Sequence, residues 1–312
     1  MRGWVAYLAC FIGVCGHASS EFVAKLAATP GPEFSVWRFM IGGIGLLIAT
    51  QFWPGARDLI TPIRQDWRRV LPLAFFGMSV AQLFFHWALD YASIVQVATM
   101  VTAMPMVVVG VDWLVNRTPI SAPKLISGFG AFIGVLLLLT DGYLEAFDIT
   151  GDAFVGTVMA FGCAITGAFY LVLVRPVVVA HGAVRMTAYT FVLGFFVLYL
   201  IVGLAWGLWV DPLTLFDKRP EQIAGIFTIG IWNTTIAMIL WLAGLSFAPD
   251  LVRANYMFFL KPVIAAFLAI VIIGDSLSLM QGMAIFAILF CVGMEYVWTD
   301  RAAKAAARRA KA

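Results

Sequence analysis

Ten apolar stretches, each long enough to cross a lipid bilayer as a helix, follow one another along the chain. They cover residues 4–27, 33–53, 70–89, 93–115, 122–141, 152–174, 184–210, 221–247, 251–273 and 277–299. A helix needs about 20 apolar residues to span the hydrocarbon core of a bilayer. Helix breakers mark the connections, such as Pro30, Gly31 and Pro32 after the first stretch. The pattern therefore predicts ten transmembrane helices.

Composition narrows the class of protein further. Of the 312 residues, 62% are hydrophobic and 12% are charged, whereas soluble domains contain roughly 45–50% and about 25%. A chain this apolar cannot cover itself with polar surface in water, so we expect an all-α integral membrane protein. The net charge of +3 is too small to indicate nucleic-acid binding. The four cysteines form no CxxC pair, so no disulfide framework, metal site or cofactor is expected.

Lysine and arginine are distributed unevenly between the two sets of loops. With the N-terminus inside, the cytoplasmic loops and ends carry fifteen of these residues, and the outside loops carry two, Lys218 and Arg219. Cytoplasmic loops of membrane proteins are enriched in Lys and Arg. The sequence therefore predicts a multi-pass protein of the bacterial inner (plasma) membrane, with both termini and the basic tail at residues 300–312 in the cytoplasm.

The spans divide into two sets of five, which places the two halves of the chain in opposite orientations. Residues 1–141 form the first five-helix repeat and residues 152–299 the second, the inverted-repeat plan of many secondary transporters. The fourth and ninth spans match most clearly, since each carries a proline near mid-membrane, Pro105 and Pro262. These prolines are candidate hinges, and fixed kinks are the alternative interpretation.

Several segments resemble the EamA-type members of the drug/metabolite transporter superfamily. They are GHASSEFVAK at residues 16–25, PEFSVWRF at 32–39, WALDYAS at 87–93, and the segments 156–175 and 262–293. The resemblance covers nearly the whole chain. It implies a ten-helix inverted-repeat fold, a central cavity between the halves and transport of small metabolites, often outward. His17, Glu21 and Lys261 depart from the family pattern, and no particular substrate is implied.

Ionisable residues inside the spans carry the functional signal. His17, Glu21 and Lys25 are spaced four apart and so form one polar stripe on the first span. An ionisable side chain in the bilayer costs about 3 kcal/mol on insertion scales, which makes a functional site the default hypothesis. Arg38 lies at a similar depth on the second span. Pairing of Glu21 with Arg38, Lys25 or Lys261 is compatible with the sequence, either as a structural lock or as a substrate site.

Further polar and aromatic residues lie on the spans that the resemblance places around the cavity. The candidate cavity residues are His17, Glu21, Trp37, Arg38, Gln82, His86, Gln96, Thr99, Trp232, Asn233, Asn255, Tyr256 and Lys261. For the Gln, Asn and Thr residues, hydrogen bonding between helices is the alternative, at about 0.6 kcal/mol each.

The interpretation that accounts for these features is a secondary transporter, with an exporter of a small amphipathic, amino-acid-like metabolite as the hypothesis. Glu21 would hold the cationic end of the substrate, Arg38 or Lys261 a carboxylate, and Trp37, Trp232 or Tyr256 the body. The alternatives are an importer or facilitator of a cationic or nucleotide-like metabolite and, more remotely, a membrane receptor or an intramembrane enzyme. An enzyme is not expected, because neither GxSxG nor HExxH occurs.

The expected partners are a small-molecule substrate and the lipid bilayer. Protons are a further candidate, through protonation of Glu21 or His17, whereas nucleic acid is not expected. A monomer and a homodimer are both compatible with the sequence.

The charge distribution gives a direct test of topology. A reporter that is active only in the periplasm, fused after Ala312, is expected to give no signal, because fifteen basic residues hold the termini and their loops in the cytoplasm. Enzymatic activity of such fusions in intact cells measures this. A strong signal would overturn the predicted orientation.

Overall fold

The computed structural model describes residues 3–143, 151–268, 270 and 278–309, and this part of the chain is built from helices and contains no strand. The helices of the first half are α1 (Gly3–His17), α2 (Ser20–Ala27), α3 (Gly31–Phe52), α4 (Thr61–Pro72), α5 (Ser79–Tyr91), α6 (Ile94–Thr102), α7 (Met104–Asn116) and α8 (Ala122–Thr140). Those of the second half are α9 (Gly151–His181), α10 (Ala183–Trp206), α11 (Pro220–Phe227), α12 (Ala237–Phe247), α13 (Leu251–Asn255), α14 (Lys261–Leu268) and α15 (Leu279–Arg309).

Short segments of other helix types join several of these helices into longer rods. A π-helical segment, η2 (Leu73–Gly77), lies between α4 and α5, and another, η5 (Thr228–Ile236), lies between α11 and α12. A 3₁₀ segment, η6 (Tyr256–Leu260), lies between α13 and α14.

Nine of the resulting rods within the described residues are long and apolar enough to cross a membrane, and an apolar stretch of α15, Leu279–Glu295, follows at the tenth predicted position. The predicted class, an all-α membrane fold of ten spans with repeated halves, is confirmed. The third span begins at Thr61, nine residues before the predicted start, because the charged helix α4 runs directly into it. The predicted end of the ninth span, at residue 273, lies outside the described residues.

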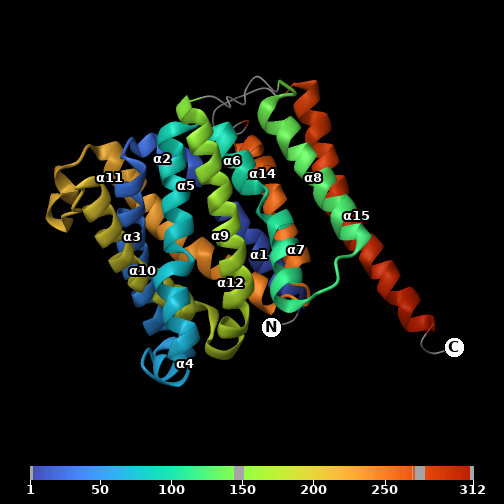
Figure 1. Ribbon diagram of the computed structural model, residues 1–312, viewed down its shortest axis with the longest axis horizontal. Helices are drawn as coiled ribbons and strands as arrows, with labels where there is room; N and C mark the ends of the chain where they lie inside the picture. The colour runs from blue at the N-terminus through green and yellow to red at the C-terminus, as the bar shows by residue number, and fades with distance from the viewer. Residues whose placement is uncertain (1–2, 144–150, 269, 271–277, 310–312) are drawn as a thin grey trace.

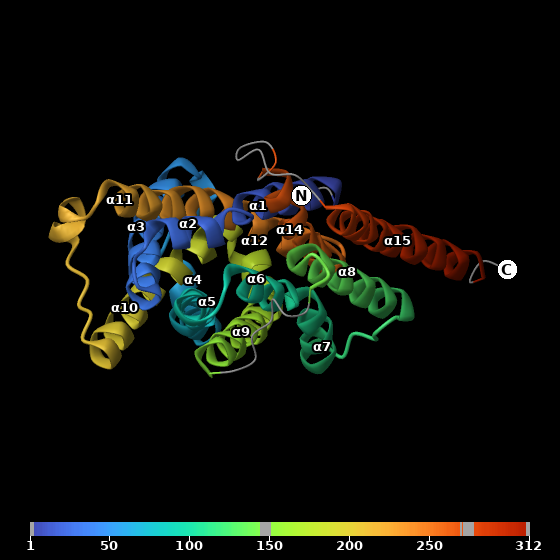
Figure 2. The same cartoon turned by 90° about the horizontal axis from the view of Figure 1, so that it is seen from above.

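The contacts between helices are symmetric with respect to the two halves of the chain. The most extensive contacts join α1 to α12, α5 to α9, α3 to α10 and α8 to α15. In span numbers these pairs are 1 with 8, 3 with 6, 2 with 7 and 5 with 10. Replacing each span by its partner in the other half converts the first pair into the second and leaves the other two unchanged. The contacts therefore have the symmetry expected of two repeats (Figures 1 and 2).

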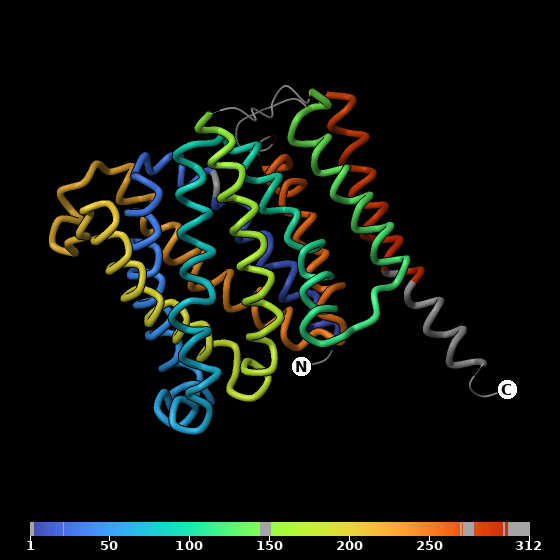
Figure 3. Tube along the Cα trace, in the orientation of Figure 1, coloured from blue at the N-terminus to red at the C-terminus, as the bar shows by residue number. Residues whose placement is uncertain are grey.

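The chain ends of the bundle lie together. Figure 1 places the start of α1 and the end of α15 at the same end of the molecule, and the trace in Figure 3 shows the end of α8 and the start of α9 at the opposite end. An even number of spans requires this arrangement. The helices α8 and α15 form a pair at one side of the bundle (Figure 1).

Both candidate hinge prolines lie directly after a break in their span. Pro105 is the second residue of α7, which begins after Ala103, and Pro262 is the second residue of α14, which follows the 3₁₀ segment η6. Proline lacks a backbone N–H and is tolerated in the first turn of a helix, where no hydrogen bond is lost. The two repeat-related spans are therefore interrupted at corresponding places, just before the proline of each.

Glycines allow α1 and α12 to touch through their backbones. A Cβ atom at Gly244 would lie 2.4 Å from the backbone nitrogen of Cys10, and one at Gly13 would lie 2.6 Å from that of Trp241. Small residues at such crossings let membrane helices approach closely, and van der Waals contact then stabilises the pair. This crossing holds the first span against the eighth.

Substitution of Gly244 is expected to destabilise the fold. Gly244→Ala forces α1 and α12 apart, and overpacking of this kind costs about 1–3 kcal/mol. The matched control is Gly282→Ala on α15, where an added Cβ would meet nothing within 4 Å. Thermal unfolding of the purified proteins in detergent should show a melting temperature several degrees lower for Gly244→Ala and an unchanged or higher value for the control. Equal melting temperatures would contradict the close-packing argument.

Candidate functional site

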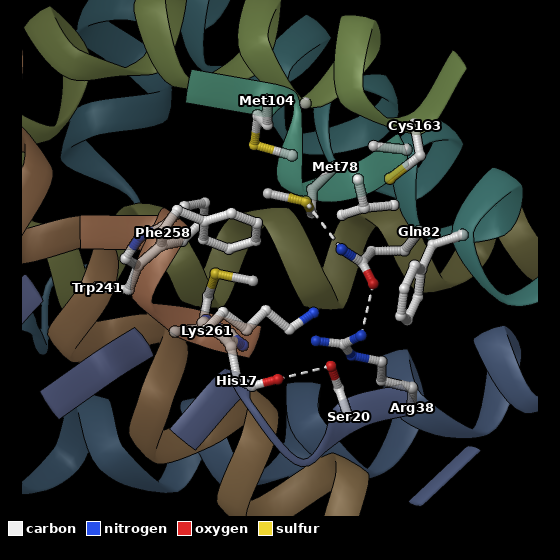
Figure 4. A pocket seen from close by; sticks show the side chains of 15 residues that line it. His17, Ser20, Arg38, Met78, Gln82, Met104, Cys163, Trp241, Phe258 and Lys261 are labelled. Carbon is white, nitrogen blue, oxygen red and sulfur yellow. Dashed lines mark hydrogen bonds between the residues drawn. The ribbon is translucent and has the colours of Figure 1, made fainter. Parts of the chain in front are cut away.

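A cavity of about 40 Å³ lies at the break between α1 and α2, enclosed by side chains from both halves of the chain (Figure 4). Its polar lining residues are His17, Ser20, Arg38, Gln82 and Lys261. Its bulkier apolar lining residues are Met78, Phe85, Met104, Met238, Trp241 and Phe258. The break itself adds polar groups, since the hydroxyl of Ser20 donates to the carbonyl oxygen of His17 at 2.8 Å.

The guanidinium of Arg38 is fixed on one side of the cavity. Arg38 is 2% exposed; its Nε donates to Thr234 Oγ1 at 2.9 Å and its Nη1 donates to Gln82 Oε1. His86 Nε2 lies 3.5 Å from the same Nη1, and His86 Nδ1 lies 2.8 Å from Ser35 Oγ. These acceptors come from α5 and η5, so the position of Arg38 depends on helices from both halves.

The π-helical segment η5 brings Thr234 to this position. The Thr234 hydroxyl donates to the carbonyl oxygen of Ile229, five residues earlier, at 2.7 Å, which is the register of a π-helix. The same oxygen accepts from Arg38. The irregular helix thus places a hydroxyl on the buried guanidinium, in line with the frequent occurrence of π segments at functional sites.

Lys261 enters the cavity from the second half of the chain. It is 5% exposed, and its Nζ lies 5.6 Å from the ring centroid of Phe85 and 5.4 Å from that of Phe258. Ring faces attract a cation at this range. Figure 4 shows the ammonium group and the Arg38 guanidinium facing the same space. The cavity wall therefore contains two buried cationic side chains, one from each half of the chain.

His17 and Trp241 form a third polar element of the wall. Their rings meet edge to face, with centroids 5.3 Å apart. His17 Nε2 and Trp241 Nε1 are buried and have no hydrogen-bond partner among the residues that the structure describes. An unsatisfied buried polar group costs about 1–3 kcal/mol.

Comparison with known proteins identifies the family. The model of the EamA-like transporter family matches residues 4–140 and 154–294. The chain belongs to the EamA-like transporter family. A protein of Archaeoglobus fulgidus named an uncharacterized transporter is 26% identical over 237 residues, which are 76% of this chain and 78% of that protein. YyaM of Bacillus subtilis, also named an uncharacterized transporter, is 26% identical over 207 residues, which are 65% of this chain and 62% of that protein.

Solved structures extend the comparison to the fold. One crystal structure superimposes with a TM-score of 0.77 at 18% sequence identity, covering 95% of this chain and 98% of that chain. At this level of identity the match shows the fold alone, and it agrees with the arrangement of repeats described above.

The structure of this EamA-like transporter brings five of the predicted site residues together. His17, Arg38, Gln82 and Lys261 line the cavity, and His86 lies behind Arg38. Glu21 belongs to α2, next to Ser20, but its side chain lies outside the described residues.

Three other predicted residues are not among those that line this cavity and form hydrogen bonds within and between helices. Asn233 Nδ2 donates to the Gly16 carbonyl oxygen at 2.6 Å, at the end of α1. Gln96 forms the capping box at the start of α6 with Ser93, and the Thr99 hydroxyl donates to the Val95 carbonyl oxygen at 2.8 Å. These contacts match the alternative of hydrogen bonding within and between helices.

The remaining predicted residues lie elsewhere. Trp37 Nε1 donates to Glu33 Oε1 at 3.0 Å, and the Tyr256 hydroxyl donates to the carbonyl oxygen of Lys124. Trp232 is 43% exposed. Asn255 is buried with no partner for its amide group among the described residues and is not among the residues that line the cavity.

Sequence reasoning missed the aromatic walls of the cavity. Phe85, Trp241 and Phe258 line it, but the chain contains 26 Phe and 11 Trp residues, so the residue type alone does not single out these three. Phe85 alone carried a usable signal, since it lies three residues after Gln82 on α5 and therefore on the same face.

The end of the bundle that carries the termini is closed by contacts between the halves. Lys124 Nζ of α8 lies 2.7 Å from Asp250 Oδ2, in the turn before α13. Within the second half, Arg175 of α9 donates to the Ala248 carbonyl oxygen of the same turn at 2.8 Å and so helps to fix the position of Asp250. Burial alone would raise the pKa of Asp250, but the hydrogen bonds from the Lys124 ammonium and the Arg253 N–H, with the charges of both residues, hold that pKa below its usual value.

The Lys124–Asp250 pair is expected to stabilise the folded protein by about 1 kcal/mol, because it is only partly shielded from solvent. Since the pKa of Asp250 is lowered in the fold, this stabilisation is present above the unfolded value of about 4 and is lost as the pH falls through the folded pKa. Melting temperatures of Asp250→Asn, Lys124→Met and the double variant, measured from neutral to acidic pH, test this. Additive single effects or an unchanged pH dependence in Asp250→Asn would show that the two side chains are not coupled.

Proposed function

We propose that this EamA-like transporter is an exporter of a small amphipathic metabolite that carries a carboxylate, with an amino-acid-like compound as the favoured class. The observation that carries the proposal is the pair of buried cations, Arg38 from the first half and Lys261 from the second, that line one cavity. A group bound between them contacts both halves of the protein at once. Such a position suits a substrate whose binding controls the movement of one half against the other.

The chemistry of the walls suits an organic anion. A guanidinium binds a carboxylate through two parallel hydrogen bonds, and an ammonium adds a second charge in a site from which bulk water is excluded. Phe85, Trp241 and Phe258 supply apolar surface for the body of the substrate, the role that the sequence had suggested for Trp37, Trp232 or Tyr256. Glu21, on the neighbouring turn of α2, would hold an amino group if the substrate has one.

The size of the cavity supports a mechanism with a conformational change. A volume of about 40 Å³ is well below the roughly 300–1,000 Å³ of small-molecule sites. Passage of a metabolite therefore requires the walls to separate. The breaks next to Pro105 and Pro262 are the proposed pivots, and opening toward the end with the termini would break the Lys124–Asp250 contact.

If export is driven by the proton gradient, protonation of His17 or Glu21 is the proposed coupling step. A facilitator would not need it. An importer or facilitator of a cationic or nucleotide-like metabolite is the alternative. The proposal places a carboxylate in this cavity because a guanidinium and an ammonium can each donate a charge-assisted hydrogen bond to one.

Substitution of Lys261 is expected to slow transport of the substrate strongly without unfolding the protein. Counterflow of labelled amino acids and simple carboxylates in proteoliposomes should identify exchanged compounds, and Lys261→Met should slow their exchange at least tenfold, because the anion loses one of two cations. Lys218→Met is the matched control. Lys218 Nζ lies 2.7 Å from Glu33 Oε1, in the first turn of α3, and Lys218 does not line the cavity.

Two results would contradict this proposal. One is an absence of exchange for every anionic compound in the panel, and the other is an equal loss of exchange in Lys261→Met and Lys218→Met. In the same assay, a double variant with Pro105→Ala and Pro262→Ala should exchange more slowly than the wild type. Unchanged exchange in that variant would reduce the two prolines to packing features.

A further inference from the structure

A recess of about 680 Å³ lies at the end of the bundle that carries the termini. Its walls come from α7, α9, the start of α8 and the turn before α13. Figure 1 shows the last turns of α7 and α9 at the same end of the molecule as the N-terminus. The volume falls within the roughly 300–1,000 Å³ typical of small-molecule sites, whereas the cavity beside Arg38 holds about 40 Å³. The recess therefore has room for a small metabolite without a movement of the helices.

Two helices connect the recess to the cavity. Met104 of α7 and Gly167 of α9 line the cavity, and a Cβ atom at Gly167 would lie 2.8 Å from Met104 Cε. Eight residues later, the same two helices bring Asp112 and Arg175 to the lining of the recess. Spans 4 and 6 run in the same direction, so equal steps of about 12 Å place these two residues at a similar depth. The recess therefore lies between this end of the bundle and the cavity, along one pair of helices.

Asp112 has a carboxylate oxygen without a partner. The residue is 7% exposed, and its Oδ1 accepts from Asn116 Nδ2 at 2.7 Å. Among the residues that the structure describes, its Oδ2 has neither a hydrogen-bond donor nor an ion-pair partner. The other acid of the recess, Asp250, is instead paired with Lys124 at 2.7 Å and accepts from the Arg253 N–H. Because a carboxylate shielded from water is costly without a donor, a cationic group is the ligand that Asp112 favours.

Arg175 keeps a donor group for a ligand. Its Nε donates to the Ser246 carbonyl oxygen at 3.4 Å, and its Nη2 donates to the Ala248 carbonyl oxygen at 2.8 Å. The third nitrogen of the guanidinium, Nη1, has no acceptor in the described part of the chain. Arg175 and Asp112 line the same recess and form no ion pair with each other. The recess therefore offers an acid and a base, each with an unused hydrogen-bonding atom.

A chamber at the opposite end of the bundle also contains one acid and one base, but the fold engages both. It has a volume of about 350 Å³ and is lined by Lys25, His86 and Asp90, among others. Both oxygens of Asp90 accept from the Gly31 N–H at the start of α3, at 2.9 and 3.0 Å. The Lys25 ammonium donates to the Leu89 carbonyl oxygen. An acid with an unused oxygen therefore distinguishes the recess from this chamber.

We infer that the recess binds the zwitterionic head of an amino acid, with the ammonium group on Asp112 and the carboxylate on Arg175. Each of these side chains forms charge-assisted hydrogen bonds with a group of the opposite charge. Val172, Val179 and Leu251 supply apolar surface for the side chain of the ligand. This inference rests on the proposed function and adds to it a first binding position, which is occupied before the walls of the cavity separate.

The test uses three probes of similar shape that differ in charge. Leucine carries both charges, isocaproate lacks the amino group and isoamylamine lacks the carboxylate. Each probe is titrated at neutral pH into the purified full-length protein in detergent, and binding is measured by calorimetry. Leucine is expected to bind at least about tenfold more tightly than either analogue, because each analogue loses one charge-assisted contact.

Variants assign each charge to its residue. Asp112→Asn is expected to weaken binding of leucine and isoamylamine about tenfold and to leave isocaproate binding unchanged. Arg175→Met should weaken binding of leucine and isocaproate and leave isoamylamine binding unchanged. If loss of the contacts with the turn unfolds this variant, Arg175→Lys should give a smaller loss for the same two probes. Asp152→Asn removes an exposed charge in the first turn of α9. It is the matched control and should bind all three probes like the wild type.

The possible failures can be told apart. An equal effect of Asp112→Asn on all three probes, or no effect on any, would give Asp112 a structural role and overturn the inference. A leucine affinity no higher than that of the analogues would also overturn it. The proposed function is decided separately, by exchange of amino acids and carboxylates and its dependence on Lys261. If that exchange occurs and leucine binding ignores Asp112→Asn, the proposed function stands without the recess. If the charge-specific binding is found and no such compound is exchanged, the recess binds amino acids and the proposed function fails.

Discussion

The cost of placing a guanidinium in the interior of a membrane protein constrains the arrangement of the helices around Arg38. A buried guanidinium must donate its hydrogen bonds to acceptors that are themselves held in place, or the fold loses several kcal/mol. Arg38 donates to Gln82 on the third span and to Thr234 on the eighth. The third span contacts the sixth and the eighth contacts the first, so one side chain links both of the symmetry-related pairs. The cavity forms where these pairs meet, with Lys261 opposite.

The spans of this protein were predictable because length and apolarity alone determine them. The ionisable residues of the cavity, His17, Arg38 and Lys261, were predictable for the related reason that such residues are rare in a bilayer. The surroundings of Tyr256 were not predictable in this way. It lies five residues before Lys261, which is about 140° around a regular helix, and its hydroxyl donates to the Lys124 carbonyl oxygen. Tyr256 begins the 3₁₀ segment η6, and Lys261 begins α14 directly after it. A change of helix type within a span leaves no clear mark in the hydrophobic pattern.

Lys25 illustrates how a charge can serve the fold rather than a substrate. Its ammonium donates to the Leu89 carbonyl oxygen near the end of α5, and Arg175 donates to the Ala248 carbonyl oxygen just after α12. The two cations belong to spans 1 and 6, and the carbonyl groups to spans 3 and 8, so the contacts correspond under the exchange of halves. Cations interact favourably with the unpaired carbonyl groups at helix C-termini. The polar stripe inferred from the spacing of His17, Glu21 and Lys25 thus contains one residue of the cavity and one of the scaffold.

The break between α1 and α2 has no counterpart in the other half, where α9 continues unbroken from Gly151 to His181. The backbone carbonyl groups at this break accept hydrogen bonds from side chains. Ser20 donates to the carbonyl oxygen of His17, and Asn233 donates to that of Gly16. The two halves therefore differ in backbone conformation where the first span lines the cavity. The repeat holds for the contacts between helices but not for the backbone of spans 1 and 6.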